Sequence, residues 1–448
     1  MQSDSPARAP QQSLRASASS FLGTTLEWYD FFIYGTTAAL VFGDLFFPNA
    51  SDVAGTLASF ATLAVGFAAR PLGGILFGHY GDRIGRKKML VLSLLTIGVS
   101  TVLIGCLPTY DQIGVGAPVL LVILRLFQGV ALGGEWGGAA LMSIEHAPKN
   151  KRGLFGSATQ MGAPGGMLLA AGAISLASWV SGDGYESWGW RLPFLASVAI
   201  VAIGTVIRSR VAESPEFQAA AERKEQAKLP IADVLREDWR AVLLGSGLAA
   251  ANNAIFYTVS TYTLSYATDH LDVDKDQVLH HVTLVAALYL VTVPLFGALA
   301  DRIGLRRQVA IAGALSALMI FPYFLLVETG NTWVILASMA VALAVVQSAA
   351  YAPQPAIYAD LFPPRVRYTG ASLAYAIPTT LVGGTAPFIG TALYAWSDSN
   401  YPFALYIAAL GALAAGCALA AKSRYASDGT PAGSAAPEPT TVGGGRRG

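Results

Sequence analysis

The sequence predicts an all-α membrane protein with twelve transmembrane helices in two six-helix halves. Three observations support this fold class. Charged residues make up only 13% of the 448 residues and hydrophobic residues 54%, whereas a soluble domain carries about 25% charged residues. Apolar runs of about 20 residues, the length that crosses a bilayer as a helix, recur along the chain. A charged motif is also repeated after six of these runs.

Each predicted helix is an apolar run bounded by polar or charged residues. In the first half, 21–208, the runs are 21–43, 55–78, 89–107, 117–142, 154–180 and 190–208. In the second half, 239–422, they are 239–268, 278–299, 309–327, 332–359, 369–396 and 401–421. These long runs exclude a transmembrane β-barrel, whose strands are alternating segments of about 10 residues.

Three polar segments flank the halves and are predicted to lie in the cytoplasm. They are an N-terminal tail (1–20), a linker (209–238) and a disordered, Gly- and Pro-rich C-terminal tail (423–448). Lys and Arg concentrate on the cytoplasmic side of membrane proteins. With both termini inside, most of the 29 Lys and Arg residues fall on that side. We therefore expect a multi-pass protein of the cytoplasmic (inner) membrane with both ends in the cytoplasm.

The repeated motif reads GHYGDRIGRKK at 78–88 and GALADRIGLRR at 297–307, an offset of 219 residues. Six helices between the copies give both halves the same orientation, which is typical of secondary transporters with a solute site at mid-membrane. The carboxylates of the motif lie at the ends of helices, where they can interact with the N-terminus of a neighbouring helix. We expect a cytoplasmic gate made of Asp82, Arg83, Arg86, Glu145, Asp301, Arg302, Arg306 and Arg307.

Four charged residues inside the predicted helices are candidates for proton coupling: Glu27 and Asp30 on the first helix, Arg125 and Glu135 on the fourth. A charge at the bilayer centre costs at least about 2.5–3.5 kcal/mol, so each needs a partner or a water-filled cavity. Helical spacing places each pair on one stripe of its helix. We expect the two stripes to face each other across a central cavity, with Asp30 paired to Arg125.

A carboxylate that alternates between Arg-paired and unpaired states can bind and release a proton. Asp30 and Arg125 could instead form a static structural ion pair. For Glu27 and Glu135, nearer the cytoplasmic end, a fixed polar contact is the alternative. The sequence alone leaves open which acid carries the proton. Arg70 is expected to snorkel or to pair with a carbonyl exposed by Pro71.

Polar residues at mid-membrane depth are the predicted solute contacts. They are Tyr34, Arg125 and Gln128 in the first half and Asn252, Asn253, Tyr257, Gln347, Tyr351 and Gln354 in the second. Arg125 is the basic residue placed to face the cavity, and its planar fork suits a carboxylate. The tyrosines could equally be helix-packing residues.

Several blocks give the chain a family resemblance. The two DRIG loops resemble the signature loop of the major facilitator superfamily, and AESPEF at 212–217 resembles a motif of its sugar-porter relatives. GTTLEWYDFFIYG, ARPLGGILFGHYGDRIGRKK, RLFQGVALGGEWGGAALMSIEHAP and LFPPRVRYTGAS resemble the metabolite:H⁺ symporter family within it. The resemblance implies the major facilitator fold. It also implies that Asp30 and Arg125 occupy the proton-coupling positions of the sugar porters. Similar transporters take organic acids, or zwitterions such as proline and betaine.

We therefore expect a proton-coupled symporter of a small organic solute, bearing a carboxylate, that works by alternating access in the bilayer. No nucleophile–base constellation and no GxxxxGK[ST] motif is present, which argues against an enzyme or an ATP-driven pump. We expect a functional monomer, no nucleic acid partner, no metal and no cofactor, with the proton as coupling ion. Gly162-Ala-Pro164-Gly165-Gly166 is reminiscent of an antiporter motif with its Pro misplaced, so proton-coupled export of an organic or drug-like solute is the alternative. Symport of a zwitterion is another.

Overall fold

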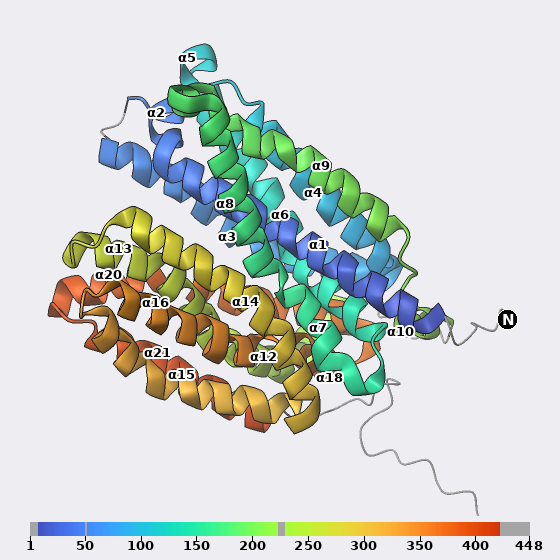
Figure 1. Cartoon of the computed structure of the whole chain (residues 1–448). Coiled ribbons are helices and arrows are strands. Elements are labelled where there is room, and N and C mark those ends of the chain that lie inside the picture. The colour runs from blue at the N-terminus through green and yellow to red at the C-terminus, as the bar shows by residue number, and fades with distance from the viewer. Residues whose placement is uncertain (1–7, 50–51, 223–228, 422–448) are drawn as a thin grey trace, which may run out of the picture.

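The computed structural model of the chain describes residues 8–49, 52–222 and 229–421, and every regular element among them is a helix. Figure 1 shows two bundles, one from the first half of the chain (blue to green) and one from the second (yellow to red). The linker helices α10 (Pro215–Glu222) and α11 (Pro230–Glu237) lie at the end of the bundles where α1 begins, here called the linker face. The predicted all-α fold with two halves is confirmed.

Six transmembrane segments form the first bundle, in the predicted order. They are α1 (Arg8–Thr37) with η1 (Ala38–Phe42) and α2 (Gly43–Phe46); α3 (Asp52–Ile84); α4 (Arg86–Gly105); α6 (Gly116–Glu145); α7 (Arg152–Gln160) with α8 (Gly162–Ser181); and α9 (Arg191–Ser209). The short helix α5 (Tyr110–Ile113) joins α4 to α6 at the end opposite the linker face.

Six further segments form the second bundle. They are α12 (Trp239–Tyr257) with η5 (Thr258–Tyr262) and α13 (Thr263–His270); α14 (Lys275–Ile303); α15 (Leu305–Val327); α16 (Thr332–Ala340) with η6 (Val341–Gln347), α17 (Ser348–Tyr351) and α18 (Gln354–Leu361); α19 (Arg367–Pro378) with η8 (Thr379–Gly383) and α20 (Ala386–Ser397); and α21 (Tyr401–Ala420). The repeat extends to the backbone, because the π-helical segments η1 and η5 start 220 residues apart, at Ala38 and Thr258.

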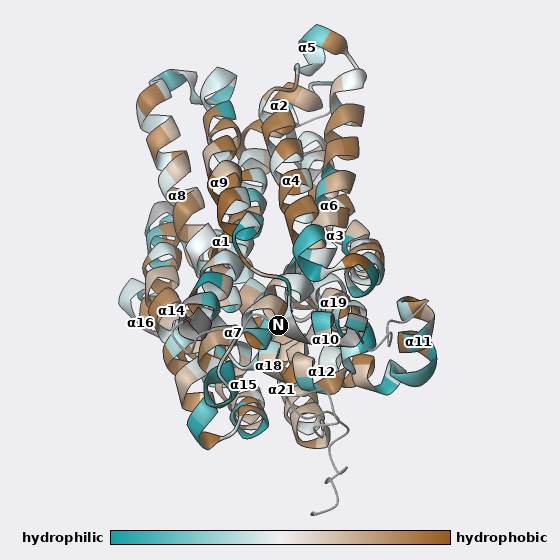
Figure 2. Ribbon diagram, turned by 90° about the vertical axis from the view of Figure 1, so that its right-hand side faces the viewer, coloured by the Kyte–Doolittle hydropathy of each residue, from teal (hydrophilic) through white to brown (hydrophobic). Residues whose placement is uncertain are grey.

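Eleven helices among the described residues are long and apolar enough to cross a membrane. The first segment is not among them, because threonines, tyrosines and the two acids interrupt its apolar run. It packs against α6 and α8 and completes the set of twelve. Figure 2 shows hydrophobic residues dominating the lengths of α4, α8 and α9, whereas hydrophilic residues gather at the helix ends and on α10. This distribution is that of a multi-pass membrane protein.

The first helix begins earlier than predicted, at Arg8, within the segment expected to be a tail (1–20). Its serines lie on the side that meets α6. Ser17 hydrogen-bonds to the Ser143 hydroxyl at 2.9 Å, and the Ser20 hydroxyl donates to the Ala139 carbonyl at 2.7 Å. Small residues allow close helix approach and their hydroxyls bond across the interface, so the polar segment continues the helix. The expected C-terminal tail lies outside the described residues.

The linker also makes more contacts than expected for a solvated connector. A Glu213 carboxylate oxygen accepts hydrogen bonds from the backbone N–H groups of Arg86 and Lys87, at 3.2 and 3.3 Å. Asp233 forms an ion pair with Arg365 at 3.7 Å. The linker therefore touches both bundles at the linker face.

Glycines set the distance between α3 and α6. A Cβ atom on Gly133 would overlap the carbonyl of Arg70, and one on Gly73 would overlap the carbonyl of Val130. The two backbones are thus in direct contact, as small residues permit in membrane helices. This contact fixes Arg70 of α3 and Arg125 of α6 relative to one another.

Candidate functional site

Asp30 of α1 lies at the centre of a polar cluster inside the first bundle and is fully buried. Its Oδ1 accepts hydrogen bonds from the Thr101 hydroxyl of α4 at 2.6 Å and from Gln128 Nε2 of α6 at 2.7 Å. Its Oδ2 accepts from Arg125 Nη1 at 3.1 Å. Three side chains from two other helices therefore direct hydrogen-bond donors at this one carboxylate. The Asp30–Arg125 pair expected from the sequence is present.

Arg125 has two further partners that do not depend on the charge of Asp30. Its Nη1 donates to Gln128 Oε1 at 3.0 Å, and its guanidinium carbon lies 4.2 Å from the centre of the Tyr34 ring, a cation–π contact. The Tyr34 hydroxyl hydrogen-bonds to Thr62. The guanidinium therefore retains a hydrogen bond and an aromatic face if Asp30 becomes neutral.

The Asp30 cluster does not face the space between the halves, which corrects the expected geometry. Trp28 lies at that boundary, and at about 100° per residue Asp30 points about 200° away from it. The stripes on α1 and α6 do meet, but within the first bundle. Tyr34, Arg125 and Gln128, expected as solute contacts, consequently belong to this cluster.

A small cavity does lie between the halves. Its volume is about 10 Å³, and it is lined by Trp28, Ala163, Asn252, Asn253, Phe256, Gln347, Tyr351 and Tyr375. This volume holds about one water molecule. An organic solute can enter this cavity only if the bundles move apart.

Four of the expected solute contacts, Asn252, Asn253, Gln347 and Tyr351, line this cavity. Of the other two in the second half, Tyr257 packs edge-on against Phe31 of the first bundle, with the two ring centres 6.2 Å apart. Gln354 is fully buried in α18, but it is not among the lining residues. Sequence reasoning missed the aromatic lining residues Trp28, Phe256 and Tyr375, because aromatic residues at helical spacing also fit simple packing.

Three of the residues that line the cavity, Trp28, Asn252 and Gln347, carry a buried polar atom without a hydrogen-bond partner. Buried side-chain atoms without a hydrogen-bond partner in the described part of the chain include Glu27 Oε2, Trp28 Nε1, Asn252 Oδ1, the Tyr257 and Tyr289 hydroxyls, Gln347 Oε1 and both amide atoms of Gln354. Leaving such a group unpaired costs about 1–3 kcal/mol. The unpartnered atoms of Trp28, Asn252 and Gln347 give the cavity free hydrogen-bonding groups for a polar ligand.

The two remaining acids each pair with an arginine that the sequence did not connect to them. Glu27 lies 3.6 Å from Arg70 Nη1, so Arg70 neither snorkels nor binds a carbonyl as expected. Glu135 forms an ion pair with Arg208 of α9 and accepts a hydrogen bond from Ser93. Arg208 ends the predicted sixth helix, and its position alone does not reveal the contact.

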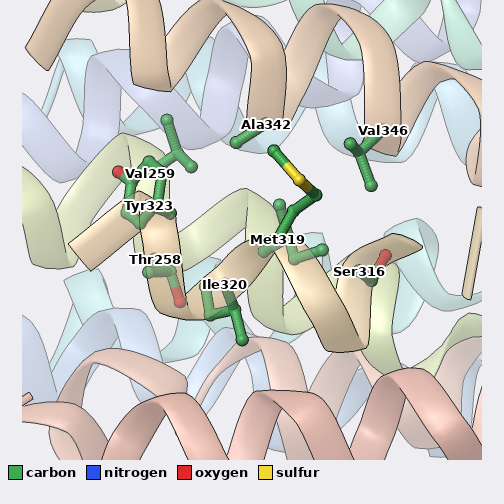
Figure 3. A pocket seen from close by; sticks show the side chains of 9 residues that line it. Thr258, Val259, Ser316, Met319, Ile320, Tyr323, Ala342 and Val346 are labelled. Carbon is green, nitrogen blue, oxygen red and sulfur yellow. The ribbon is translucent and has the colours of Figure 1, made fainter. Parts of the chain in front are cut away.

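A second cavity, of about 20 Å³, lies inside the second bundle between η5, α15 and η6 (Figure 3). Its lining is apolar except for three hydroxyl groups. Thr258 donates to the Ala254 carbonyl and Ser316 to the Ala312 carbonyl, both at 2.7 Å, and the Tyr323 hydroxyl bonds to Thr263 at 2.6 Å. Because its polar groups are satisfied, this cavity does not resemble a solute site.

At the linker face the repeated aspartates bind across the two halves. Asp82 of α3 accepts hydrogen bonds from the backbone N–H groups of Tyr368 and Thr369 at the start of α19, at 3.1 and 2.9 Å. Asp301 of α14 accepts from two backbone N–H groups at the start of α7, at 2.6 and 2.9 Å. Each carboxylate thus lies at the positive end of a helix dipole in the other half.

Two ion-pair triads accompany these aspartates, each with one carboxylate between two arginines: Arg86–Glu145–Arg367 and Arg306–Asp360–Arg152. In both triads the last arginine belongs to the half opposite the other two residues. The Arg152–Asp360 distance is 2.7 Å and the Arg367–Glu145 distance 3.2 Å. Arg83, Arg302 and Arg307, also expected in the gate, are exposed and lie outside both triads.

Comparisons with known proteins agree with this architecture. The family model described as sugar (and other) transporter matches residues 16–238, and the model described as Major Facilitator Superfamily matches residues 244–442. An inner membrane metabolite transport protein of Escherichia coli K12, YhjE, is 41% identical over 88% of this chain and 90% of its own length. The chain belongs to the major facilitator superfamily.

Other relatives and structures are consistent with this assignment. The shikimate transporter of E. coli K12 is 41% identical over 91% of this chain and 92% of its own length. The proline/betaine transporter of the same strain is 33% identical over 88% of this chain and 80% of its own length. The proton:xylose symporter XylE bound to 6-bromo-6-deoxy-D-glucose aligns with a TM-score of 0.73 at 17% identity, covering 91% of this chain and 95% of that one. This likeness supports the fold. The transporter is therefore a membrane carrier of small molecules and not an enzyme.

Proposed function

We propose that the transporter couples proton movement to the uptake of a small carboxylate-bearing solute by alternating access. It would act as a monomer in the cytoplasmic (inner) membrane, with its termini in the cytoplasm. The observation that carries the proposal is the enclosed Asp30 cluster. A membrane-buried carboxylate that has both a cationic partner and a neutral replacement partner for that cation is suited to reversible protonation.

Protonation of Asp30 removes the charge that attracts Arg125. The guanidinium then keeps its bond to Gln128 Oε1 and its contact with the Tyr34 ring. The protonated carboxyl can still bond to Thr101 and Gln128. Release of the proton restores the ion pair, so the cluster has two well-bonded states that differ by one proton.

The first helix connects this cluster to the solute cavity. Trp28 lines the cavity, whereas Asp30 lies on the opposite side of the same helix, among α4 and α6. A rotation or shift of α1 that follows protonation of Asp30 would therefore move Trp28. In this proposal the rigid helix carries the coupling between proton and solute.

The contacts at the linker face form the proposed gate on that side. Asp82, Asp301 and the two triads join the halves there, so they must break before the solute can leave through that face. Three further gate residues predicted from the sequence belong to the triads. Arg86 and Glu145 lie in one triad, and Arg306 lies in the other.

Replacing Asp82 with Asn is expected to slow transport about tenfold without changing which solute is carried. The amide keeps one acceptor but loses the charge that faces the start of α19, and hydrogen bonds to charged groups contribute about 1.5–3 kcal/mol. Initial uptake rates and competition by unlabelled solutes measure both effects. Asp111→Asn, on exposed α5 at the other end, is the matched control. A changed order of solute preference would place Asp82 in the binding site instead.

Two observations bear on the solute class. A shikimate transporter is among the relatives, which favours a carboxylate, and a proline/betaine transporter favours the second candidate, a zwitterion. Arg125 is already bonded to Asp30 and Gln128 and does not line the cavity, so a carboxylate bound there would have to displace Asp30.

Uptake into proteoliposomes that contain the purified transporter tests the proposal. With the outside more acidic by one pH unit, symport with one proton accumulates a labelled solute up to about tenfold. Shikimate, proline and glycine betaine form the first panel, and a proton uncoupler should abolish accumulation. Accumulation that persists with the uncoupler would refute proton coupling. Accumulation driven by the opposite pH gradient would establish the antiport alternative.

A further inference from the structure

Arg70 differs from the other buried arginines of the described chain. Five arginines are at most 4% exposed: Arg70, Arg86, Arg125, Arg208 and Arg367. The other four each donate hydrogen bonds. Arg86 donates to Ser214, and Arg125 donates to Asp30 and Gln128. Arg208 donates to Glu135, and Arg367 donates to the Phe362 carbonyl. Arg70 donates none within the described residues. Its contacts are the ion pair with Glu27 at 3.6 Å and the Phe67 ring, 4.7 Å from its guanidinium carbon.

The pair therefore has free bonding capacity on both sides. A guanidinium has five N–H donors, and an N–O separation of 3.6 Å is too long for a hydrogen bond. On the acid, Glu27 Oε2 is buried and has no hydrogen-bond partner. Leaving a buried carboxylate oxygen unpaired is costly, so a ligand that donates a hydrogen bond to Glu27 Oε2 would be favoured.

The pair lies close to the boundary between the halves. Glu27 and Arg70 belong to the first bundle, and the centre of the Phe67 ring that Arg70 contacts lies 6.3 Å from the centre of the Tyr257 ring of the second bundle. Trp28, next to Glu27 in α1, lines the small central cavity, but neither Glu27 nor Arg70 does. The pair can therefore contact the contents of the cavity only when the cavity opens.

The other unpartnered groups of this region indicate the rest of the ligand. Asn252 Oδ1 and Gln347 Oε1 are hydrogen-bond acceptors without a donor, as is Glu27 Oε2. Acceptors of this kind are satisfied by hydroxyl or N–H groups of a ligand. A quaternary ammonium group has no N–H to donate and would leave them unpaired.

We propose that Arg70 binds the carboxylate of the solute and that Glu27 accepts a hydrogen bond from one of its hydroxyl groups. The solute is then a small hydroxylated carboxylate. In the empty site Glu27 neutralises Arg70 through a long ion pair, and the entering carboxylate replaces it by two parallel N–H···O bonds. This inference rests on the proposed transport function and moves the anion site from Arg125 to Arg70.

Binding measured without any proton gradient tests the inference. The purified full chain in detergent is titrated with shikimate, gluconate and lactate, and with the methyl ester of shikimate and glycine betaine, while thermal stability is recorded. At least one of the three hydroxylated carboxylates should stabilise the wild-type protein, and the ester and betaine should not. Arg70→Gln should weaken binding about tenfold to a hundredfold, and Arg70→Lys should weaken it less.

The matched control is Arg240→Gln, because Arg240 also stacks on an aromatic ring, that of Trp239 at 5.3 Å, but is exposed at the linker face. If Arg70→Gln fails to fold because Glu27 is left unpaired, the double variant Arg70→Gln/Glu27→Gln removes both charges and is titrated in its place. Wild-type affinity in either variant would overturn the inference, as would a wild-type protein that none of the three carboxylates stabilises.

The outcome is separable from that for proton coupling. Binding through Arg70 combined with uptake that ignores the uncoupler would refute only the proposed symport. Proton-driven uptake that survives in Arg70→Gln with unchanged affinity would refute only the assignment of Arg70.

Discussion

Asp30→Asn is expected to abolish proton-driven accumulation while leaving solute exchange across the membrane intact. Asparagine resembles the protonated acid: it can bond to Thr101 and Gln128, but it can neither take up nor release a proton. Arg125 would stay with Gln128 and Tyr34. In proteoliposomes with an acidic exterior, the accumulation ratio should fall from about tenfold to about one, and exchange of labelled for unlabelled solute at equal pH should continue.

The control is Asp44→Asn in α2, which makes the same chemical change at an exposed position of the first transmembrane segment. It should accumulate solute as the wild type does. Wild-type accumulation by Asp30→Asn would mean that the Asp30–Arg125 pair is structural and that another acid carries the proton.

Gly133→Leu is expected to prevent assembly of the first bundle. A Cβ atom at this position would overlap the backbone carbonyl of Arg70, and a backbone cannot turn aside as a side chain does. Overpacking usually costs about 1–3 kcal/mol where side chains can adjust, and here α3 and α6 would have to separate along their length. The yield of monodisperse protein after detergent extraction and its thermal transition measure the loss.

The matched control is Gly172→Leu in α8, where a Cβ atom would meet nothing within 4 Å. Both changes add the same side chain to the interior of a transmembrane helix. Equal yield and stability of the two variants would contradict the close packing of α3 on α6.

The order of the helices and eleven of the twelve membrane-crossing segments follow directly from hydropathy. Long apolar runs have no alternative to crossing the bilayer, since unpaired backbone groups are not tolerated in lipid. The repeat at offset 219 likewise predicts two halves of the same orientation. The start of α1 is predicted less well, because its serines are polar by composition but bond to neighbouring segments in the fold. Ser17 and Ser20 bond to α6, and Ser13 bonds to the carbonyl of His146, directly after α6.

The direction in which a polar stripe points could not be predicted. Helical spacing shows that residues share one side of a helix, but it does not say whether that side meets its own bundle or the other one. Asp30 and Trp28 are two residues apart and point to different places for this reason. The sequence predicts that Arg70 snorkels or pairs with a helix carbonyl, and it does not reveal the actual partner, Glu27, which lies 43 residues away on another helix.

The aspartates of the linker-face network, Asp82 and Asp301, could be predicted from the repeated motif that contains them. The ion-pair triads carry a weaker repeat in the sequence. Glu145 and Asp360 are 215 residues apart, as are Arg152 and Arg367, and these pairs hold equivalent places in the two triads. The residues around them differ between the halves, so the second repeat is visible only once the fold shows which residues meet.

The most direct test of the central claim, that a proton travels with the solute, is a solute-evoked pH change. Proteoliposomes containing the wild-type transporter and a trapped pH-sensitive dye are prepared at the same pH inside and outside, and an accepted solute is added outside. Symport predicts that the interior acidifies in step with solute entry and that Asp30→Asn vesicles show no such change. Solute entry by the wild-type protein without interior acidification, or with the interior becoming alkaline, would contradict the account.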